Sequence, residues 1–226
     1  METGCLDRET IYKYLAEHPK LIDGYLNLET QLQPNGFDMT LEEVRGFQSS
    51  KDTIGTLTFE NSGRVLPATK PLKFDVEGMC YLEPGPYLIR LNEVVNLPNH
   101  IMALARPRSS LLRSGVTIHN AVWDAGYQGR SQALLMVYHP GGFMLSRNAR
   151  VLQLVFFYLA NPVTQGYEGQ FLGEGVPGLF SGKRLGSVVD GLRSWIRCLD
   201  RNLLWGKRNT PRLFNSCISY GGVCLH

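Results

Sequence analysis

The sequence has little of what marks a nucleic-acid-binding, membrane or secreted protein. Its formal net charge is only +3 over 226 residues, which is too small to indicate a nucleic-acid or membrane-surface partner by itself. No apolar run approaches the ~18 residues that a membrane span needs. The first ten residues, METGCLDRET, are too polar for a secretory signal peptide. We therefore expect a cytoplasmic protein with no nucleic-acid and no membrane partner.

Cysteine is scarce and badly spaced for a disulfide framework or a zinc site. The number of cysteines is odd and no two of them form a C-x-x-C pair. A disulfide framework normally needs an even set at close spacing, and zinc ribbons need paired cysteines. We therefore expect reduced thiols at all five positions, which are Cys5, Cys80, Cys198, Cys217 and Cys224.

Two helical patterns flank a long region of short strands. Residues 6–17 predict an amphipathic helix with Asp7 as its N-cap and Pro19 beyond its end. Residues 187–205 predict a second helix with one apolar face. From about 27 to 160, short apolar runs alternate with Gly, Pro, Asn and Ser, which is typical of a barrel or sandwich of antiparallel strands. These runs are 37–41, 55–59, 87–91, 100–105, 133–138 and 149–159.

The composition divides the chain into three parts. Residues 1–160 are predicted to form one β domain that includes the N-terminal helix. Residues 161–184 are rich in glycine and poor in pattern, so we expect a flexible segment that can act as a lid. Residues 185–226 form an extension of unknown role.

The segment 106–130 carries the residues best suited to bind phosphate. Arginines surround the pair Ser109 and Ser110, so guanidinium groups, hydroxyls and backbone N–H groups lie close together in the sequence. Such a combination can bind phosphate oxygens. The alternative is a solvated basic loop before a strand. The arginines in question are Arg106, Arg108 and Arg113.

A second group follows at once in the run VWDAGYQG. Asp124 lies between an apolar strand and a turn in which Gly126 and Gly129 allow positive φ or close approach of a ligand. The ring of Tyr127 can stack on a flat or sugar-like group. A carboxylate beside bound phosphate can orient a water molecule for attack. The alternative is an ordinary β-hairpin whose aspartate hydrogen-bonds its own turn.

Five motifs, in order, resemble those of the trimeric dUTPase and dCTP deaminase superfamily. The resemblance extends over about residues 8–172 and is closest to the deaminase-like, archaeal-type dUTPases. It implies an all-β fold, a distorted jelly-roll-like barrel, to which the helical patterns described above add a short N-terminal helix and a helical C-terminal extension. The motifs are LQPNGFDMTL (32–41), PRSSLLRSG (107–115), AVWDAGYQG (121–129), NARVLQL (148–154) and YEGQ (167–170).

The resemblance also implies a role for each matched residue. Asp124 would orient the attacking water and contact the deoxyribose 3′-hydroxyl. Tyr127 would pack under the sugar and exclude a 2′-hydroxyl. The basic motif would bind the triphosphate across a subunit boundary of a homotrimer. Its matched residues are Arg108, Ser109, Ser110 and Arg113.

Three further positions match the family. Gln153 would contact the phosphates or the water, or it is an amide satisfied within the sheet. Arg150 would contact the ligand, or it forms a structural ion pair with Asp124 or Asp38. Gln170 matches a position that contacts the pyrimidine edge in deaminases.

The implied reaction is the Mg²⁺-dependent hydrolysis of dUTP to dUMP and pyrophosphate by a dUTP diphosphatase. The Mg²⁺ would arrive on the triphosphate, with no direct protein ligand. Deaminases of this family use a glutamate ten positions after the hairpin aspartate, where this chain has Leu134, which cannot transfer a proton. The zinc deaminase signatures H-x-E and P-C-x-x-C are absent as well. The alternatives are a bifunctional dCTP deaminase and dUTPase, and a catalytically inactive nucleotide-binding regulator.

Overall fold

The computed structural model describes residues 3–49 and 54–176. Its first element, α1 (Arg8–Ala16), buries Ile11 and Leu15 and is capped by Asp7, whose carboxylate accepts a hydrogen bond from the backbone N–H of Thr10 at 2.8 Å. This confirms the predicted N-terminal helix and its cap. The predicted helix at 187–205 and the remainder of the extension lie outside the described residues. No helix in the described part is long and apolar enough to cross a membrane.

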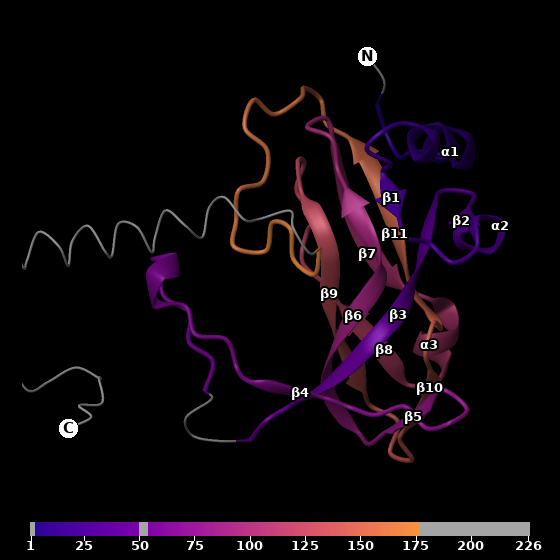
Figure 1. The fold of residues 1–226 in the computed structure, drawn as a ribbon, viewed down its shortest axis with the longest axis vertical. Helices are drawn as coiled ribbons and strands as arrows, with labels where there is room; N and C mark the ends of the chain where they lie inside the picture. Colours follow the sequence, from indigo (N-terminus) through magenta and orange to yellow (C-terminus); the bar gives the residue numbers. More distant parts are fainter. Residues whose placement is uncertain (1–2, 50–53, 177–226) are drawn as a thin grey trace, which may run out of the picture. The chain divides into compact units, whose positions relative to one another are not determined.

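One antiparallel sheet forms the body of the fold (Figure 1). Its main path runs in the order β7 (Ile101–Pro107), β11 (Arg150–Tyr158), β3 (Gly36–Phe47), β6 (Gly85–Asn96), β9 (Gln128–Val137) and β8 (Val116–His119). Three short strands extend the sheet: β1 (Ile22–Asp23), β2 (Leu32–Gln33) and β4 (Thr69–Pro71). A separate pair consists of β5 (Met79–Leu82) and β10 (Phe143–Ser146). The other short elements are α2 (Leu28–Gln31), α3 (Ser109–Arg113) and the 3₁₀ turn η2 (Asn61–Gly63).

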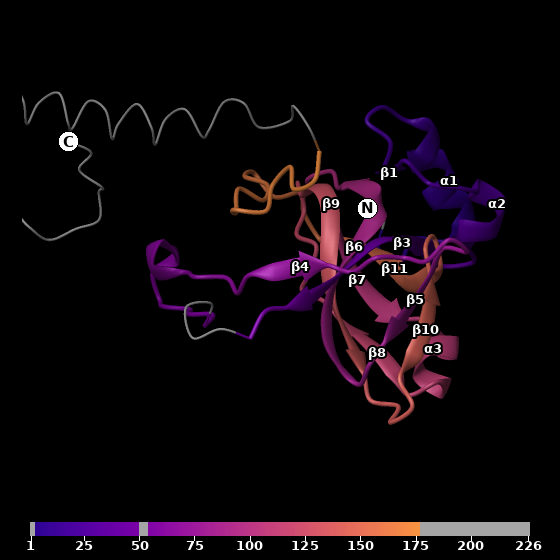
Figure 2. The same cartoon turned by 60° about the horizontal axis from the view of Figure 1, so that its bottom comes forward.

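The two ends of this path meet, so the sheet closes on itself (Figure 2). β7 lies against β8, and the residues after β8 continue along β7. Trp123 and Ala103 exchange both backbone hydrogen bonds, at 3.0 and 2.9 Å. Further along, the side-chain amide of Asn120 donates to the carbonyl of Ala105 at 3.3 Å. The predicted barrel of antiparallel strands is confirmed.

Each long strand turns alternate side chains into the barrel. On β9, Ser131, Ala133, Leu135 and Val137 are buried, whereas the residues between them are only partly covered. Phe37 of β3 and Phe156 of β11 are among the largest side chains that are fully buried. The alternation therefore leaves Arg130, Gln132 and Leu134 on the outer face of β9.

The predicted strand at 55–59 is wrong. This run forms only an isolated bridge between Thr56 and Val65, and the side chains of Leu57 and Phe59 are 77% and 100% exposed. Alternating apolar residues favour a strand only where a sheet face covers them, and no described sheet face covers this run. The basic segment after β7 also differs from the expected turn or loop, because Ser109–Arg113 forms the five-residue helix α3.

Candidate active site

The hairpin that leads into β9 presents Asp124 at the point where the barrel closes. Asp124 follows Trp123 directly, and its carbonyl accepts a hydrogen bond from the N–H of Tyr127 at 3.0 Å. Gly126 completes this turn with a φ of +83°, which favours glycine. The Asp124 side chain is exposed and has no hydrogen-bond or ion-pair partner within residues 3–49 and 54–176. It is therefore free to bind a water molecule or a sugar hydroxyl.

A chain of hydrogen bonds holds Tyr127 in place. The indole N–H of Trp123 donates to the hydroxyl of Ser131 at 2.6 Å, and that hydroxyl donates to the phenol oxygen of Tyr127 at 3.3 Å. The ring of Tyr127 meets the ring of Tyr167 edge-on, with centroids 5.6 Å apart. Burial raises the pKa of Tyr127 to about 12. The phenol therefore stays neutral at physiological pH, and only 7% of the residue's surface is exposed.

Residues 161–176 run alongside this hairpin without forming a strand (Figure 1, orange). The N–H of Tyr167 donates to the carbonyl of Ala125 at 2.8 Å, and the N–H of Gly173 donates to the carbonyl of Gln128 at 2.6 Å. The described part of the predicted lid segment is thus bonded to the hairpin at two points.

Glycine makes this close packing feasible. A Cβ atom at Gly126 would lie 2.6 Å from the Cα of Gly166 and 3.0 Å from the backbone nitrogen of Tyr167. A Cβ atom at Gly129 would lie 2.8 Å from the phenol oxygen of Tyr127. Both glycines of the hairpin motif have positive φ, as predicted, and permit close packing within the chain. The predicted close approach of a ligand stays a prediction.

The hairpin, the 161–176 segment and the neighbouring strands line a cavity of about 890 Å³. This volume is in the range of small-molecule sites. Asp124, Tyr127 and Gln170, three of the predicted site residues, all line it. Trp123 and Tyr167 also line the cavity and belong to two of the matched motifs, although no role was predicted for them. Arg64, Ser131 and Glu174 line it too, and they come from outside those motifs.

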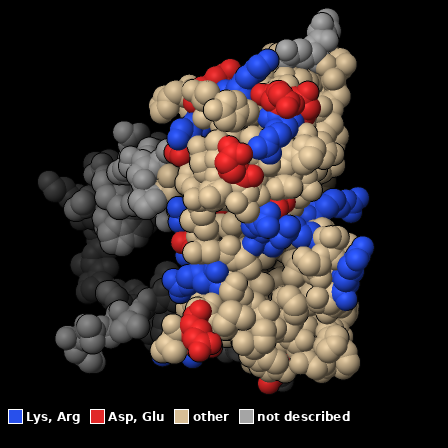
Figure 3. Space-filling model, turned by 90° about the vertical axis from the view of Figure 1, so that its right-hand side faces the viewer, with Lys and Arg blue, Asp and Glu red and all other residues tan. Residues whose placement is uncertain are grey.

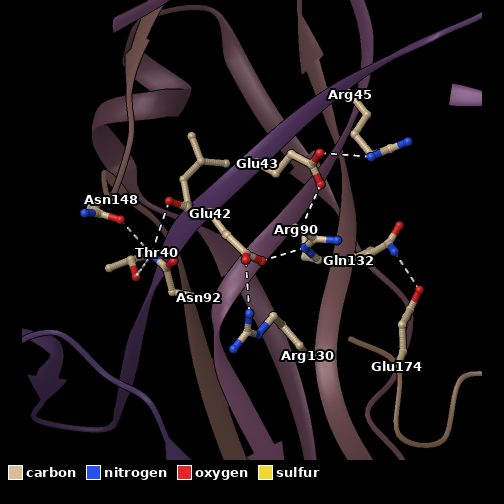
Figure 4. Close-up of polar contacts among 11 residues, drawn as sticks. Thr40, Glu42, Glu43, Arg45, Arg90, Asn92, Arg130, Gln132, Asn148 and Glu174 are labelled. Carbon is tan, nitrogen blue, oxygen red and sulfur yellow. Dashed lines mark hydrogen bonds and ion pairs between the residues drawn. The ribbon is translucent and has the colours of Figure 1, made fainter. Parts of the chain in front are cut away.

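Two further carboxylates line the cavity from the 161–176 segment, those of Glu168 and Glu174. Glu174 is half-buried, and one of its carboxylate oxygens accepts a hydrogen bond from the side-chain amide of Gln132 at 2.6 Å (Figure 4). Burial raises the pKa of Glu174, and the nearby charge of Arg90 opposes that shift. No motif marks Glu174 in the sequence.

Ion pairs join the three strands beside this contact (Figure 4). Glu42 of β3 accepts from Arg90 of β6 at 2.5 Å and from Arg130 of β9 at 3.0 Å. Arg90 also lies 3.0 Å from Glu43, which in turn pairs with Arg45 at 2.9 Å. All these side chains are partly exposed, so each pair is worth little by itself, but together they fix the outer face on which Gln132 lies.

The remaining predicted residues gather around a different carboxylate. Nε of Arg108 and Nη1 of Arg150 both lie 3.1 Å from the same oxygen of Asp38. Gln153 is directly opposite Asp38 in the register between β11 and β3. The ion pair between Arg150 and Asp38, one of the predicted alternatives for Arg150, is therefore present. We call these residues, together with the exposed Ser109, Ser110 and Arg113 of α3, the arginine group.

The arginine group carries an excess of positive charge. Asp38 is only 2% exposed, and burial raises the pKa of its carboxyl despite the opposing charges of Arg108 and Arg150. Two guanidinium groups share this one carboxylate, so a net positive charge remains. Figure 3 shows Lys and Arg side chains across the middle of the face that carries α1, α2 and α3. An anion such as a phosphate suits this charge.

Within one protomer the arginine group and Asp124 lie apart. The bridge between Trp123 and Ala103 places Asp124 beside the start of β7, whereas Arg108 follows the end of that strand. Six residues of extended chain between those levels correspond to roughly 20 Å. No member of the arginine group lines the cavity. In both ribbon views α3 and the 161–176 segment lie on opposite sides of the barrel.

Residues 5–159 match the family model described as dCTP deaminase-like. The chain is 43% identical over 171 residues to a probable deoxyuridine 5′-triphosphate nucleotidohydrolase of Methanosarcina mazei, covering 76% of this chain and 98% of that protein. A protein of the same name from Archaeoglobus fulgidus is 48% identical over 162 residues, which is 72% of this chain and 92% of that protein.

Among solved structures, the chain is similar to the 2′-deoxycytidine 5′-triphosphate deaminase of Agrobacterium tumefaciens, with a TM-score of 0.52 and 24% identity. The match covers 70% of this chain and 49% of that one, so it supports the fold alone. The family model, by contrast, extends over most of the barrel, and the chain covers nearly the whole length of both archaeal relatives. The chain therefore belongs to the dCTP deaminase-like family.

Proposed function

We propose that this chain is a dUTP diphosphatase, which hydrolyses dUTP to dUMP and pyrophosphate. One observation carries the proposal: the exposed, unpaired carboxylate of Asp124 lies beside the fixed ring of Tyr127 in a cavity of about 890 Å³. The names of the archaeal relatives from Methanosarcina mazei and Archaeoglobus fulgidus support the same activity.

Asp124 acts as the general base. Its carboxylate accepts a hydrogen bond from a water molecule and receives a proton as the water oxygen attacks the α-phosphorus. The new P–O bond forms as the bond from that phosphorus to the bridging oxygen breaks, and pyrophosphate leaves with the bonding electron pair. Positioning of the water in line with the leaving group supplies much of the rate enhancement.

Tyr127 selects the sugar. Its ring is held by Ser131 and packed against Tyr167, so it cannot move aside for a bulkier sugar. A ribose would press its 2′-hydroxyl against the ring and leave that hydroxyl without a partner. The ring therefore favours dUTP over UTP. The exposed side chain of Gln170 lines the same cavity, and its NH₂ group is available to the pyrimidine edge, while its oxygen accepts from Arg64 at 2.9 Å.

The arginine group binds the triphosphate from a neighbouring subunit. The guanidinium groups of Arg108 and Arg113 and the hydroxyls of Ser109 and Ser110 form charge-assisted and neutral hydrogen bonds to phosphate oxygens. Gln153 lies next to them and contacts the same phosphates. The separation within one protomer supports this assignment, because only a second copy can bring the arginine group to Asp124. We infer a homotrimer with sites between subunits, as in the family that the motifs resemble.

The carboxylates of the cavity fit a Mg²⁺ ion that arrives on the substrate. No group of three or more His, Cys, Asp or Glu side chains suited to a metal ion occurs in the part of the chain that the structure describes. Mg²⁺ keeps several of its waters and binds readily through phosphate oxygens, so it needs no such group. When bound, the ion neutralises phosphate charge. Asp124 is the carboxylate placed to contact its water shell.

Glu174 favours one second candidate, deamination of dCTP. Leu134 supplies no proton-transfer group on β9, but the carboxyl of Glu174 is bonded to Gln132, which shares the outer face of β9 with Leu134. A half-buried carboxyl whose pKa is raised can serve as a general acid or base. Release of ammonia from dCTP would establish this activity.

The assay that tests these functions supplies dUTP, UTP or dCTP with Mg²⁺ and measures pyrophosphate and ammonia. We expect pyrophosphate from dUTP, little from UTP, and no ammonia. Asp124→Asn should lower kcat by about 10³-fold while the affinity for a non-hydrolysable dUTP analogue stays within a few-fold, because the base is lost and the contacts remain.

The control is Asp23→Asn, which removes the same charge from an exposed side chain outside the cavity. It should leave kcat unchanged. Turnover that survives Asp124→Asn would remove Asp124 from its role. Recovery of bound but intact dUTP from the unaltered protein would indicate a nucleotide-binding regulator instead.

A further inference from the structure

Two polar side chains meet in the wall of the cavity from distant parts of the chain. Gln132 lies on the outer face of β9, and Glu174 comes from the segment that runs alongside the hairpin. The amide nitrogen Nε2 of Gln132 donates to Oε1 of Glu174 at 2.6 Å (Figure 4). Both residues line the cavity together with Asp124 and Tyr127.

This contact leaves a donor and an acceptor unused. Oε2 of Glu174 has no hydrogen-bond partner among the described residues, and neither has the second N–H of the Gln132 amide. The pair therefore offers an acceptor immediately beside a donor. A half-buried carboxylate oxygen without a partner costs free energy unless a ligand or water supplies one.

An acceptor beside a donor complements the hydrogen-bonding edge of uracil but not that of cytosine. Uracil presents the O4 acceptor next to the N3–H donor. O4 can accept from the amide of Gln132 while N3–H donates to the carboxylate of Glu174. Cytosine in the same position presents an amino group to the Gln132 amide and a lone pair to the Glu174 carboxylate, so both contacts become repulsive.

The backbone fixes the pair before a ligand binds. The N–H of Arg130 donates to the carbonyl of Glu174 at 2.6 Å. Gly129 permits this close approach, because a Cβ atom at position 129 would lie only 3.2 Å from the backbone nitrogen of Glu174. Glu42 in turn holds Arg130 and Arg90 on the same face. A preorganised pair discriminates better than one that has to be ordered by its ligand.

We propose that Gln132 and Glu174 together select uracil over cytosine at the base end of this cavity. The proposal rests on the proposed function, since it places the base of a deoxynucleotide beside this pair. It differs from the role assigned to Gln170, whose amide is exposed and accepts a hydrogen bond from Arg64 at 2.9 Å.

A purely structural role for the same contact is the alternative, because the hydrogen bond also attaches the 161–176 segment to β9. The two roles differ in what they do to base preference. If the contact only attaches the segment, its loss weakens the binding of every nucleotide alike. If the Glu174 carboxylate accepts from the base, its loss weakens the binding of uracil nucleotides and leaves that of cytosine nucleotides unchanged.

Glu174→Gln separates the two roles. The amide oxygen of the new side chain can still accept from Gln132, so the tether is retained, but an NH₂ donor replaces the acceptor that faces N3. We expect kcat/KM for dUTP to fall about 100-fold while that for dCTP falls much less or rises, because a site with the wrong hydrogen-bonding group rejects its substrate strongly. The ratio of the two values should shift by at least about tenfold toward dCTP.

The same ratio is measured without turnover from the equilibrium binding of dUMP and dCMP. Glu77→Gln, which removes the same charge from an exposed turn outside the cavity, is the matched control and should leave both ratios unchanged. An equal loss for uracil and cytosine nucleotides in Glu174→Gln would overturn the proposal. So would an unaltered protein that binds dUMP and dCMP equally well. If dUTP is not hydrolysed but dUMP is preferred over dCMP and Glu174→Gln removes that preference, the proposed function fails and the selectivity pair stands.

Discussion

The cavity and the arginine group differ in nearly every physical property. The cavity is lined by aromatic rings and by the carboxylates of Asp124, Glu168 and Glu174. The arginine group has one buried carboxylate, that of Asp38, shared between two guanidinium groups. On the proposed function, the cavity supplies the base and the place for sugar and pyrimidine, and Arg64 is the single Lys or Arg among its described lining residues. The arginine group has the cations but no free base. The difference supports the proposal that the two ends of β7 divide the chemistry of dUTP hydrolysis and that each site is completed between subunits.

The strongest test of this difference uses two variants, one inactivated in the cavity and the other in the arginine group, and mixes their subunits. Asp124→Asn and Arg108→Ala should each lower kcat/KM for dUTP by about 10³-fold when every subunit carries the change. Subunits of the two variants that are unfolded, mixed in equal amounts and refolded should regain about a quarter of the unaltered activity, because about one site in four then combines two intact halves.

Complementation has a built-in control. Mixing Asp124→Asn with Asp124→Asn/Arg108→Ala should restore nothing, since every site then lacks the base. If the first mixture also fails, while native mass spectrometry shows oligomers that contain both variants, the two regions do not meet across a subunit boundary.

A smaller effect is expected from Gly126→Ala, which alters the cavity alone. The new methyl group would sit 2.6 Å from the Cα of Gly166 on a residue with φ of +83°, so both a clash and backbone strain result. The 161–176 segment has to shift, and we expect KM for dUTP to rise by about 10- to 100-fold. Steady-state kinetics measures this change, and circular dichroism should report an intact barrel. An unchanged KM would show that packing of this segment against the hairpin does not shape the site.

The smallest effect is expected from Asp38→Asn, which alters the arginine group alone. Burial of the Asp38 charge is costly, and the side chains of Arg108 and Arg150 are 32% and 31% exposed, so water can solvate them when their partner is lost. The free energy of unfolding should therefore change by only about 1 kcal/mol. The two arginines lose their common partner, and KM for dUTP should rise by about three- to tenfold. Urea denaturation and kinetics measure the two quantities. A loss of several kcal/mol with unchanged KM would make Asp38 a purely structural residue.

Local patterns predicted much of the fold and of the site. The Asp7 cap, the long strands and the turn at Asp124 all depend on neighbouring residues, and each was predicted from the sequence. The strand at 55–59 was predicted wrongly because its apolar residues have no sheet to cover them.

What could not be predicted depends on contacts between distant residues. Glu174 lies 42 positions from Gln132, and only the packing of 161–176 against the hairpin brings them together. The hydrogen bonds from Trp123 to Ser131 and on to Tyr127 exist because the hairpin folds back over β9. No spacing rule in the sequence encodes either contact.

The two backbone hydrogen bonds between Trp123 and Ala103 close the barrel at the residue just before Asp124. Local opening of this contact would displace Asp124 directly, because Trp123 is its neighbour in the chain. The same coupling works in reverse. On the proposed function, a nucleotide bound to Asp124 would also stabilise the contact between Trp123 and Ala103, so filling the cavity would raise the resistance of the barrel to heat.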